Sequence, residues 1–349
     1  MRLSVLDQSP IPEGSTAVDA LRNTLDLSKL ADQLGYHRYW VAEHHGGPML
    51  ASASPEVLIG PIASATAGIR VGSGGVMLPH YSPLKVAETF TVLAALYPGR
   101  IDLGIGRAAG TDPMTTFALQ RDRRQAAPDD FPQQLAELLA YFDDSLPADH
   151  PFRHLAKTLP GRPELPEPWL LGSSPQSAIW AAQLGLPYAF ADFINPGGAS
   201  IAKTYQERSA PGAARTAVAA WVLCADSDEE AHYLAASSRM TLRLLRRGEL
   251  IPVPAPDKAI AFLESEGVSV SNAVPGRRGI IGSPAAVAAG VQELASEYGA
   301  EEVIVVTITH DHGARRRSYE LLADAFALAP RDLIRDQAPA RPPQQIPVP

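Results

Sequence analysis

The chain has 349 residues, of which 46% are hydrophobic and 19% are charged, and its net charge at pH 7 is -8. This acidic balance argues against nucleic acid or an anionic membrane as the main partner. The single cysteine, Cys224, excludes an internal disulfide and a multi-cysteine metal or iron–sulfur site. No apolar run reaches the roughly 18 residues of a membrane span, and the chain starts with a strand-like segment and not a secretory signal. We therefore expect a cytoplasmic globular protein.

Short apolar, strand-like runs alternate with segments of helical periodicity along the chain. Eight such units predict an α/β fold, a closed (β/α)8 TIM barrel with insertions in the loops after the strands. An open, doubly wound sheet is the alternative. The expected strands are residues 3–6, 38–42, 69–79, 100–107, 169–171, 188–191, 217–224 and 303–308. The expected helices are residues 16–34, 55–67, 83–97, 131–142, 176–184, 199–208, 228–246, 285–298 and 314–327.

Three segments lack regular periodicity and are interpreted as loops that form the pocket walls. They are residues 108–130, 145–168 and 247–279, the last of which ends at a short strand-like run before the next helix. The barrel is expected to span residues 1–330. Residues 331–349 are rich in proline and are expected to form a disordered tail.

The expected strands at 69–79 and 100–107 both carry glycines near their ends. The first contains Ser73, Gly74 and Gly75, and the second contains Gly104 and Gly106. Glycine at such a position lets the backbone approach something flat or anionic. In a barrel, the loops after the strands share one face, and this face forms the active site.

Small polar and titratable residues follow the other expected strands as well, so they should converge on the same rim. We expect this rim to comprise Asp7, Gln8, Ser9, Glu43, His44, His45, Arg107, Gly172, Ser173, Ser174, Phe193, Asn195, His310, Asp311 and His312.

A serine-rich turn opens the helix that follows the strand at 169–171. Ser173, Ser174 and Ser177 bring hydroxyls to the free N–H groups of this helix N-terminus, which is a natural phosphate seat. Arg107 on the same rim would add a positive charge. The alternative is that one serine only caps the helix.

The histidines leave several interpretations open. Adjacent residues in a strand point to opposite faces, so His44 and His45 are a poor chelating pair, and one of them could move protons in the barrel mouth. Both could also be ordinary loop residues. The alternate spacing of His310 and His312 permits a metal ligand pair, but the first strand has no His-x-His to complete a familiar barrel metal site. We predict no metal.

Residues 104–109 match the dinucleotide fingerprint G-x-G-x-x-A, with Gly104, Gly106 and Ala109 at its fixed positions. The fingerprint should open a helix. Here Gly110 and Pro113 follow and break one, so this match is weak.

Several motifs together resemble the luciferase-like monooxygenase family, from Arg2 to about Ala327. They are Asp7-Gln-Ser-Pro10, Tyr39-Trp-Val-Ala-Glu-His-His45, Val71-Gly-Ser-Gly-Gly-Val-Met-Leu-Pro79, Gly99-Arg-Ile-Asp-Leu-Gly-Ile-Gly-Arg107, Gly172-Ser-Ser174 and Thr309-His-Asp-His312. The resemblance implies a (β/α)8 barrel that binds reduced FMN and activates oxygen at the flavin.

The resemblance also implies roles for particular residues. His44 matches the histidine used for proton transfer near the flavin. Gly74 and Gly75 match a non-proline cis peptide beneath the flavin ring. The expected cofactor-binding residues are Ser73, Gly74, Gly75, Arg107, Ser173, Ser174, Ser177 and Asn195. One departure is Gly106, which stands where bacterial luciferase α chains have a reactive cysteine, so light emission with a long aldehyde is not implied.

We therefore predict an FMN-dependent monooxygenase that oxygenates a small organic substrate through a flavin C4a-(hydro)peroxide. A separate flavin reductase would supply reduced FMN, and the family suggests a homodimer. Three alternatives remain. They are a deazaflavin-dependent dehydrogenase or reductase on the same fold, a flavin-binding protein without turnover, and a metal hydrolase that uses His310 and His312.

Overall fold

The computed structural model describes residues 1–107, 112–125, 129–269 and 276–331. The tail expected to be disordered lies outside the described residues, apart from Arg331, and so does part of the G-x-G-x-x-A match. Within the described ranges, no helix is both long and apolar enough to cross a membrane.

Eight parallel strands form a closed barrel. Each strand pairs with its neighbours in the order β6-β5-β4-β3-β2-β1-β9-β7, and the pairing of β6 with β7 closes the ring. The predicted (β/α)8 barrel is therefore confirmed, because an open doubly wound sheet would leave two free edges. The barrel strands are β1 (Arg2–Asp7), β2 (Arg38–Val41), β3 (Arg70–Met77), β4 (Ile101–Gly106), β5 (Glu167–Gly172), β6 (Tyr188–Ala191), β7 (Thr216–Cys224) and β9 (Glu302–Val306).

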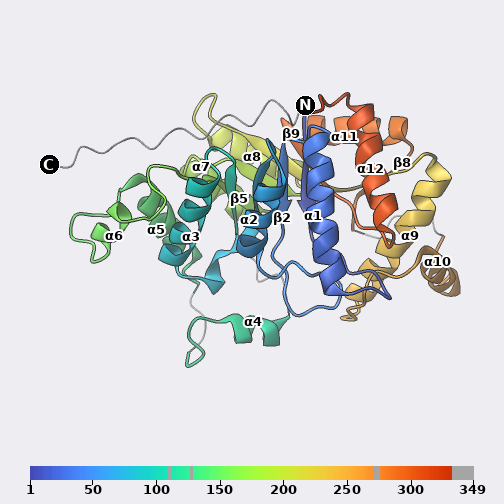
Figure 1. Cartoon of the computed structure of the whole chain (residues 1–349), viewed down its shortest axis with the longest axis horizontal. Helices are drawn as coiled ribbons and strands as arrows, with labels where there is room; N and C mark the ends of the chain where they lie inside the picture. Colours follow the sequence, from blue (N-terminus) through green and yellow to red (C-terminus); the bar gives the residue numbers. More distant parts are fainter. Residues whose placement is uncertain (108–111, 126–128, 270–275, 332–349) are drawn as a thin grey trace.

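Helices surround this barrel (Figure 1). Their apolar faces pack on the outer sides of the strands and build the main core, whereas a smaller cluster that includes Leu6, Trp40 and Trp169 fills the interior. The helices predicted from periodicity are α1 (Ala17–Gln33), α2 (Pro55–Ala65), α3 (Pro83–Leu96), α5 (Phe131–Asp143), α7 (Pro175–Gln183), α8 (Ala199–Arg208), α9 (Asp228–Leu245), α11 (Pro284–Tyr298) and α12 (His312–Ala325).

The three segments expected to be loops contain further elements, so that expectation is wrong in part. They are α4 (Pro113–Leu119), α6 (Arg153–Lys157), α10 (Pro256–Ser265) and the start of a ninth strand, β8 (Gly279–Gly282); outside these segments, the 3-10 helix η1 (Leu78–His80) follows β3. The helices α4 and α6 are too short to show a period. In α10, Ala259 and Leu263 pack one turn apart against Met240 and Leu244 of α9. Among the described residues, β8 pairs with the end of β7, outside the closed ring.

The amino-terminal end of the barrel is closed by buried charges. Arg38 of β2 donates from Nη1 to Asp102 of β4 (2.8 Å) and from Nε to Glu302 of β9 (3.0 Å). Glu167 of β5 lies 3.1 Å from Arg38. Burial raises the pKa of Glu167, but the hydrogen bond from Arg215 and the charge of Arg38 outweigh it and lower this pKa to about 2. Glu167 therefore stays ionised at neutral pH, whereas burial raises the pKa of Asp102 against the lowering charges of Arg38 and Arg70.

We expect Arg38→Met to destabilise the fold by about 3–5 kcal/mol, because it removes the close cation of the buried Glu302 and leaves the buried Asp102 with Arg70 alone. Arg247→Met is the matched control. It removes an exposed arginine that pairs with Glu266, and should cost far less stability than Arg38→Met. Urea unfolding of the two variants measures both values. Equal losses would contradict a special role for the buried network.

Candidate active site

Two adjoining cavities open among the carboxyl ends of the strands. The larger has a volume of about 490 Å³ and the smaller about 310 Å³. Phe193 and Ile194, which follow β6, belong to both linings. The combined space is in the range of small-molecule sites, and it lies at the end of the barrel where the sequence predicts the site.

The floor of the smaller cavity is a glycine ledge formed by Gly74 and Gly75, whose peptide bond is cis as the resemblance implies. A Cβ on Gly74 would collide with Leu6, and one on Gly75 would lie 2.7 Å from the Gly104 carbonyl oxygen. No side chain fits at either position. The ledge is therefore bare backbone beside the apolar Leu6 and Trp40.

Ser73 lies behind the ledge and lines neither cavity. It is buried, and its hydroxyl donates to the Gly104 carbonyl oxygen at 2.9 Å. A Cβ at Gly104 would in turn collide with the Ser73 carbonyl oxygen. This glycine of the G-x-G-x-x-A match therefore serves the close packing of β3 on β4.

The serines lie at the start of α7, on the wall of the smaller cavity. The Ser177 backbone N–H donates to Ser174 Oγ (3.3 Å), so Ser174 does cap the helix. Ser177 Oγ donates to the Ser174 carbonyl oxygen (2.8 Å) and lies 2.9 Å from the Tyr188 hydroxyl. Asn195 lies outside both linings, and its Nδ2 donates to the Ser173 carbonyl oxygen at 2.9 Å.

Arg107 completes this wall. Its side chain is exposed at the end of β4, with the guanidinium 5.8 Å from the Trp180 ring of α7. Among the residues that the structure describes, no carboxylate pairs with it. Arg107, Ser173, Ser174 and Ser177 all line the smaller cavity, so a cation, hydroxyls and a helix N-terminus meet there. We call this group the anion seat.

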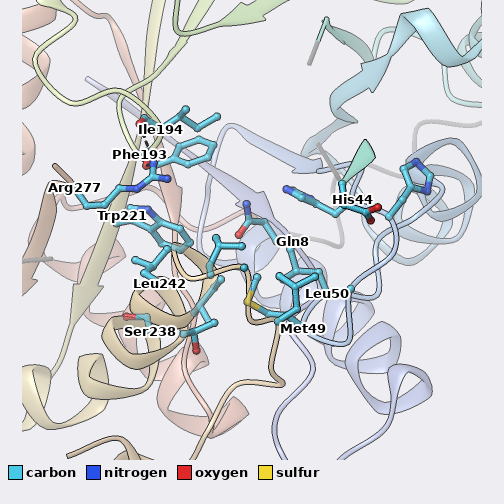
Figure 2. Close-up of a pocket in the computed structure, with 18 residues that line it drawn as sticks. Gln8, His44, Met49, Leu50, Phe193, Ile194, Trp221, Ser238, Leu242 and Arg277 are labelled. Carbon is cyan, nitrogen blue, oxygen red and sulfur yellow. Dashed lines mark hydrogen bonds between the residues drawn. The ribbon is translucent and has the colours of Figure 1, made fainter. Parts of the chain in front are cut away.

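His44 faces the larger cavity, opposite Phe193 and Trp221 and next to Gln8 (Figure 2). Its backbone N–H donates to the Ser52 carbonyl oxygen (2.9 Å), whereas the buried Nδ1 has no partner in the described part of the chain. Burial, helped by the charge of His45, lowers the pKa of His44 to about 4. The ring is therefore neutral at neutral pH and does not titrate there.

His45 has a different setting, although it also lines the larger cavity. Its Nε2 lies 2.9 Å from Oε1 of the fully buried Glu43. Glu43 also accepts hydrogen bonds from the Met77 backbone N–H (2.9 Å) and the Tyr81 hydroxyl (3.1 Å). His45 thus belongs to a network that joins the end of β2 to the end of β3.

Two of the expected rim residues are structural. Asp7 is buried in an ion pair with Arg315 of α12 (2.7 Å) and accepts a hydrogen bond from the Tyr39 hydroxyl. Ser9 is also buried, with its hydroxyl 2.7 Å from that of Thr24. Only Gln8 of this segment faces a cavity.

The residues proposed as a metal pair have other contacts. Asp311 caps α12 by accepting from the Ala314 N–H (2.7 Å), and His312 Nε2 lies 2.9 Å from Asp26. His310 Nε2 is 3.2 Å from the Glu13 carbonyl oxygen. In the described part of the chain, no three His, Cys, Asp or Glu side chains are grouped so that they could hold a metal ion.

Sequence reasoning missed several pocket residues. Trp180 and Phe131 line the anion-seat side, and Trp221 and Arg277 line the larger cavity. The aromatic residues are part of regular apolar patterns, which do not separate the pocket wall from the core. Arg277 lies in a segment read as a loop, and its only signal is an arginine pair next to a strand-like run.

The fold and site define a class, a (β/α)8 barrel with a glycine ledge and an anion seat at the carboxyl ends of its strands. The family model for luciferase-like monooxygenases matches residues 1–302, and the chain belongs to this family of oxidoreductases. A luciferase-like monooxygenase from Escherichia coli (strain K12) is 43% identical over 328 residues, which cover 92% of this chain and 96% of that protein.

Solved structures agree with this assignment. The crystal structure of apo-MsnO8 has a TM-score of 0.85 at 42% identity, covering 95% of this chain and 99% of that chain. The oxygenating constituent of 3,6-diketocamphane monooxygenase from Pseudomonas putida, solved in complex with FMN, has a TM-score of 0.70 at 20% identity. It covers 93% of this chain and 96% of that chain, and its likeness shows the fold alone.

The lowered pKa of His44 predicts a pH effect on stability. The unfolded chain binds a proton near pH 6.5 and the folded protein only near pH 4, so the free energy of unfolding falls as the pH drops through this window. His44→Asn should reduce this fall in the free energy of unfolding by about 2 kcal/mol. Urea unfolding at about pH 6.5 and about pH 4 measures it. His154→Asn, at an exposed position, is the control and should leave the fall unchanged. A fall of wild-type size in His44→Asn would contradict the buried, neutral ring.

Proposed function

We propose that the protein is a flavin-dependent monooxygenase that uses reduced FMN and O2 to oxygenate a small organic molecule. The observation that carries this proposal is the smaller cavity, in which the anion seat and the glycine ledge share one apolar pocket. The larger cavity adjoins it, so a second molecule could be held beside the first.

The residues of the smaller cavity fit the parts of FMN. Arg107 and the N-terminus of α7 suit a phosphate, because the guanidinium and the positive end of the helix dipole both favour an anion and Arg107 has no carboxylate partner among the described residues. The bare ledge at Gly74 and Gly75 suits a flat ring, because neighbouring protein atoms leave no room for a Cβ at either position and the floor is backbone alone. Leu6 and Trp40 provide apolar surface beside it.

Each residue would then have a definite task. Arg107, Ser173, Ser174 and Ser177 would bind the phosphate. Ser73 and Asn195 would act as positioning residues, since Ser73 holds β3 to β4 and Asn195 holds the Ser173 carbonyl oxygen. Bound in its reduced form, FMN would supply the electrons that activate O2. His44, neutral and at the larger cavity, could hold or pass on a proton at a ring nitrogen, while the apolar walls exclude water.

The supply of electrons and the assembly state are also part of the proposal. The glycine at position 104 serves strand packing, which leaves the weak nicotinamide fingerprint without support and favours a separate flavin reductase. We also propose a cytoplasmic homodimer formed through the helices after the early strands. Val57 of α2 and Val92 and Leu96 of α3 are exposed apolar side chains on these helices.

The anion seat can be tested with two ligands that differ by the phosphate. Arg107→Gln should weaken the binding of reduced FMN by about tenfold to a hundredfold and that of reduced riboflavin by about twofold or less. Anaerobic fluorescence titration measures both affinities. Arg124→Gln, which alters an exposed arginine paired with Asp122, is the control. If Arg107→Gln weakened the binding of reduced FMN and of reduced riboflavin equally, the phosphate would have to bind elsewhere.

The oxygenase chemistry is tested by an oxygen pulse given to the complex with reduced FMN. We expect O2 to be consumed before the absorbance of oxidised flavin returns, whereas the two coincide for free reduced FMN. If O2 consumption and the return of oxidised flavin also coincided in the presence of the protein, this would indicate a flavin-binding protein without turnover. Tighter binding of the reduced deazaflavin F420 than of FMN would indicate a dehydrogenase instead.

A further inference from the structure

The larger cavity has an apolar body. Met49 and Leu50 form one wall, Leu242 of α9 forms another, and Trp221 and Phe193 lie at one end (Figure 2). A volume of about 490 Å³ suits a small organic molecule with a hydrocarbon portion.

Arg277 brings a positive charge into this apolar wall. Its half-buried guanidinium donates from Nη1 to the carbonyl oxygens of Phe193 and Ile194, the latter at 2.8 Å. No carboxylate in the described part of the chain pairs with it. The neighbouring Arg278 differs, because it pairs with Glu297 (2.5 Å) and lies 3.7 Å from Asp192. Arg277 therefore keeps donors for a ligand.

The surroundings leave this charge uncompensated. Burial, and next the charge of Arg246, lower the pKa of Arg277, yet a guanidinium remains protonated at neutral pH. Asp112 is the acidic side chain in the lining, but it is exposed and accepts the backbone N–H groups of Met114 and Thr115 at the start of α4.

The other polar groups near this wall are already engaged. Ser238 and Thr241 of α9 donate their hydroxyl protons to the carbonyl oxygens of Ala235 (3.0 Å) and Ser237 (2.8 Å). Arg277 is thus the strongest donor available to a ligand on this side. A half-buried cation without a counter-charge has lost part of its hydration, and an anionic group bound to it would offset that loss.

We infer that the larger cavity binds an amphipathic organic anion, whose carboxylate or sulfonate contacts Arg277 and whose hydrocarbon part lies against Met49, Leu50 and Leu242. As the identity of a substrate, this inference rests on the proposed monooxygenase function. His44 lies across the cavity from Arg277, so the hydrocarbon part would extend between them (Figure 2). Arg277 then sets specificity for the charged end.

The test compares octanoate with octanamide, which has the same chain and no charge. Calorimetric titration of the wild-type protein should give octanoate at least about tenfold tighter binding. Arg277→Gln should abolish this preference and leave the affinity for octanamide unchanged, and Arg277→Lys should keep part of it. Arg278→Gln is the matched control and should retain the full preference. Octanesulfonate, titrated in parallel, shows which anionic group is favoured.

Two outcomes would overturn the inference. Equal affinity of the wild type for octanoate and octanamide, or no binding of either, would mean that Arg277 recognises no anion. If Arg277→Gln lost affinity for octanoate and octanamide equally, Arg277 would act only by holding Phe193 and Ile194 in place. All titrations are done without flavin, so failure of FMN to bind would overturn the proposed function without altering these results.

Discussion

The ion network around Arg38 is the interaction on which the rest of the barrel depends. Arg38 joins β2 to β4 and to β9, strands that are not its neighbours in the sheet. These bonds cross the barrel interior and fix its amino-terminal end. Without them, large side chains alone would have to fill this space. Because the charges are buried, each is stable only with its partners present. The opposite end is thereby free to be built from small residues.

The glycines of β3 and β4 use this freedom. Gly74 and Gly75 present backbone to the smaller cavity, and the Ser73 hydroxyl binds the Gly104 carbonyl oxygen behind them. The anion seat lies at the ends of β4 and β5, where Arg107 follows β4 and the serines open α7. A rigid floor and a polar corner thus come from three adjacent strands, β3, β4 and β5, whose register the sheet fixes.

Periodicity was enough to predict the barrel, because alternating strands and helices leave few other ways to bury their apolar faces. It was also enough to bring Arg107, Ser173, Ser174 and Ser177 to one place, since the ends of parallel strands share a face. Arg38, Asp102 and Glu302 could not be foreseen as partners, because charged residues at strand starts look like solvent-exposed ends. Asp7 was expected on the rim of the active site but is buried in an ion pair. Its partner Arg315 lies on the last helix of the barrel, far away in the sequence. Arg277 and α10 depend on packing within an irregular insertion, which carries no periodic signal.

Phe193 and Ile194 are shared by the linings of both cavities. A ligand that moves these side chains in one cavity changes the free energy of binding in the other. Thermodynamic linkage makes this coupling reciprocal, so each ligand alters the affinity for the other by the same factor. The strength of any such coupling therefore depends on this pair of residues, and Arg277, which holds their carbonyl oxygens, takes part in setting it.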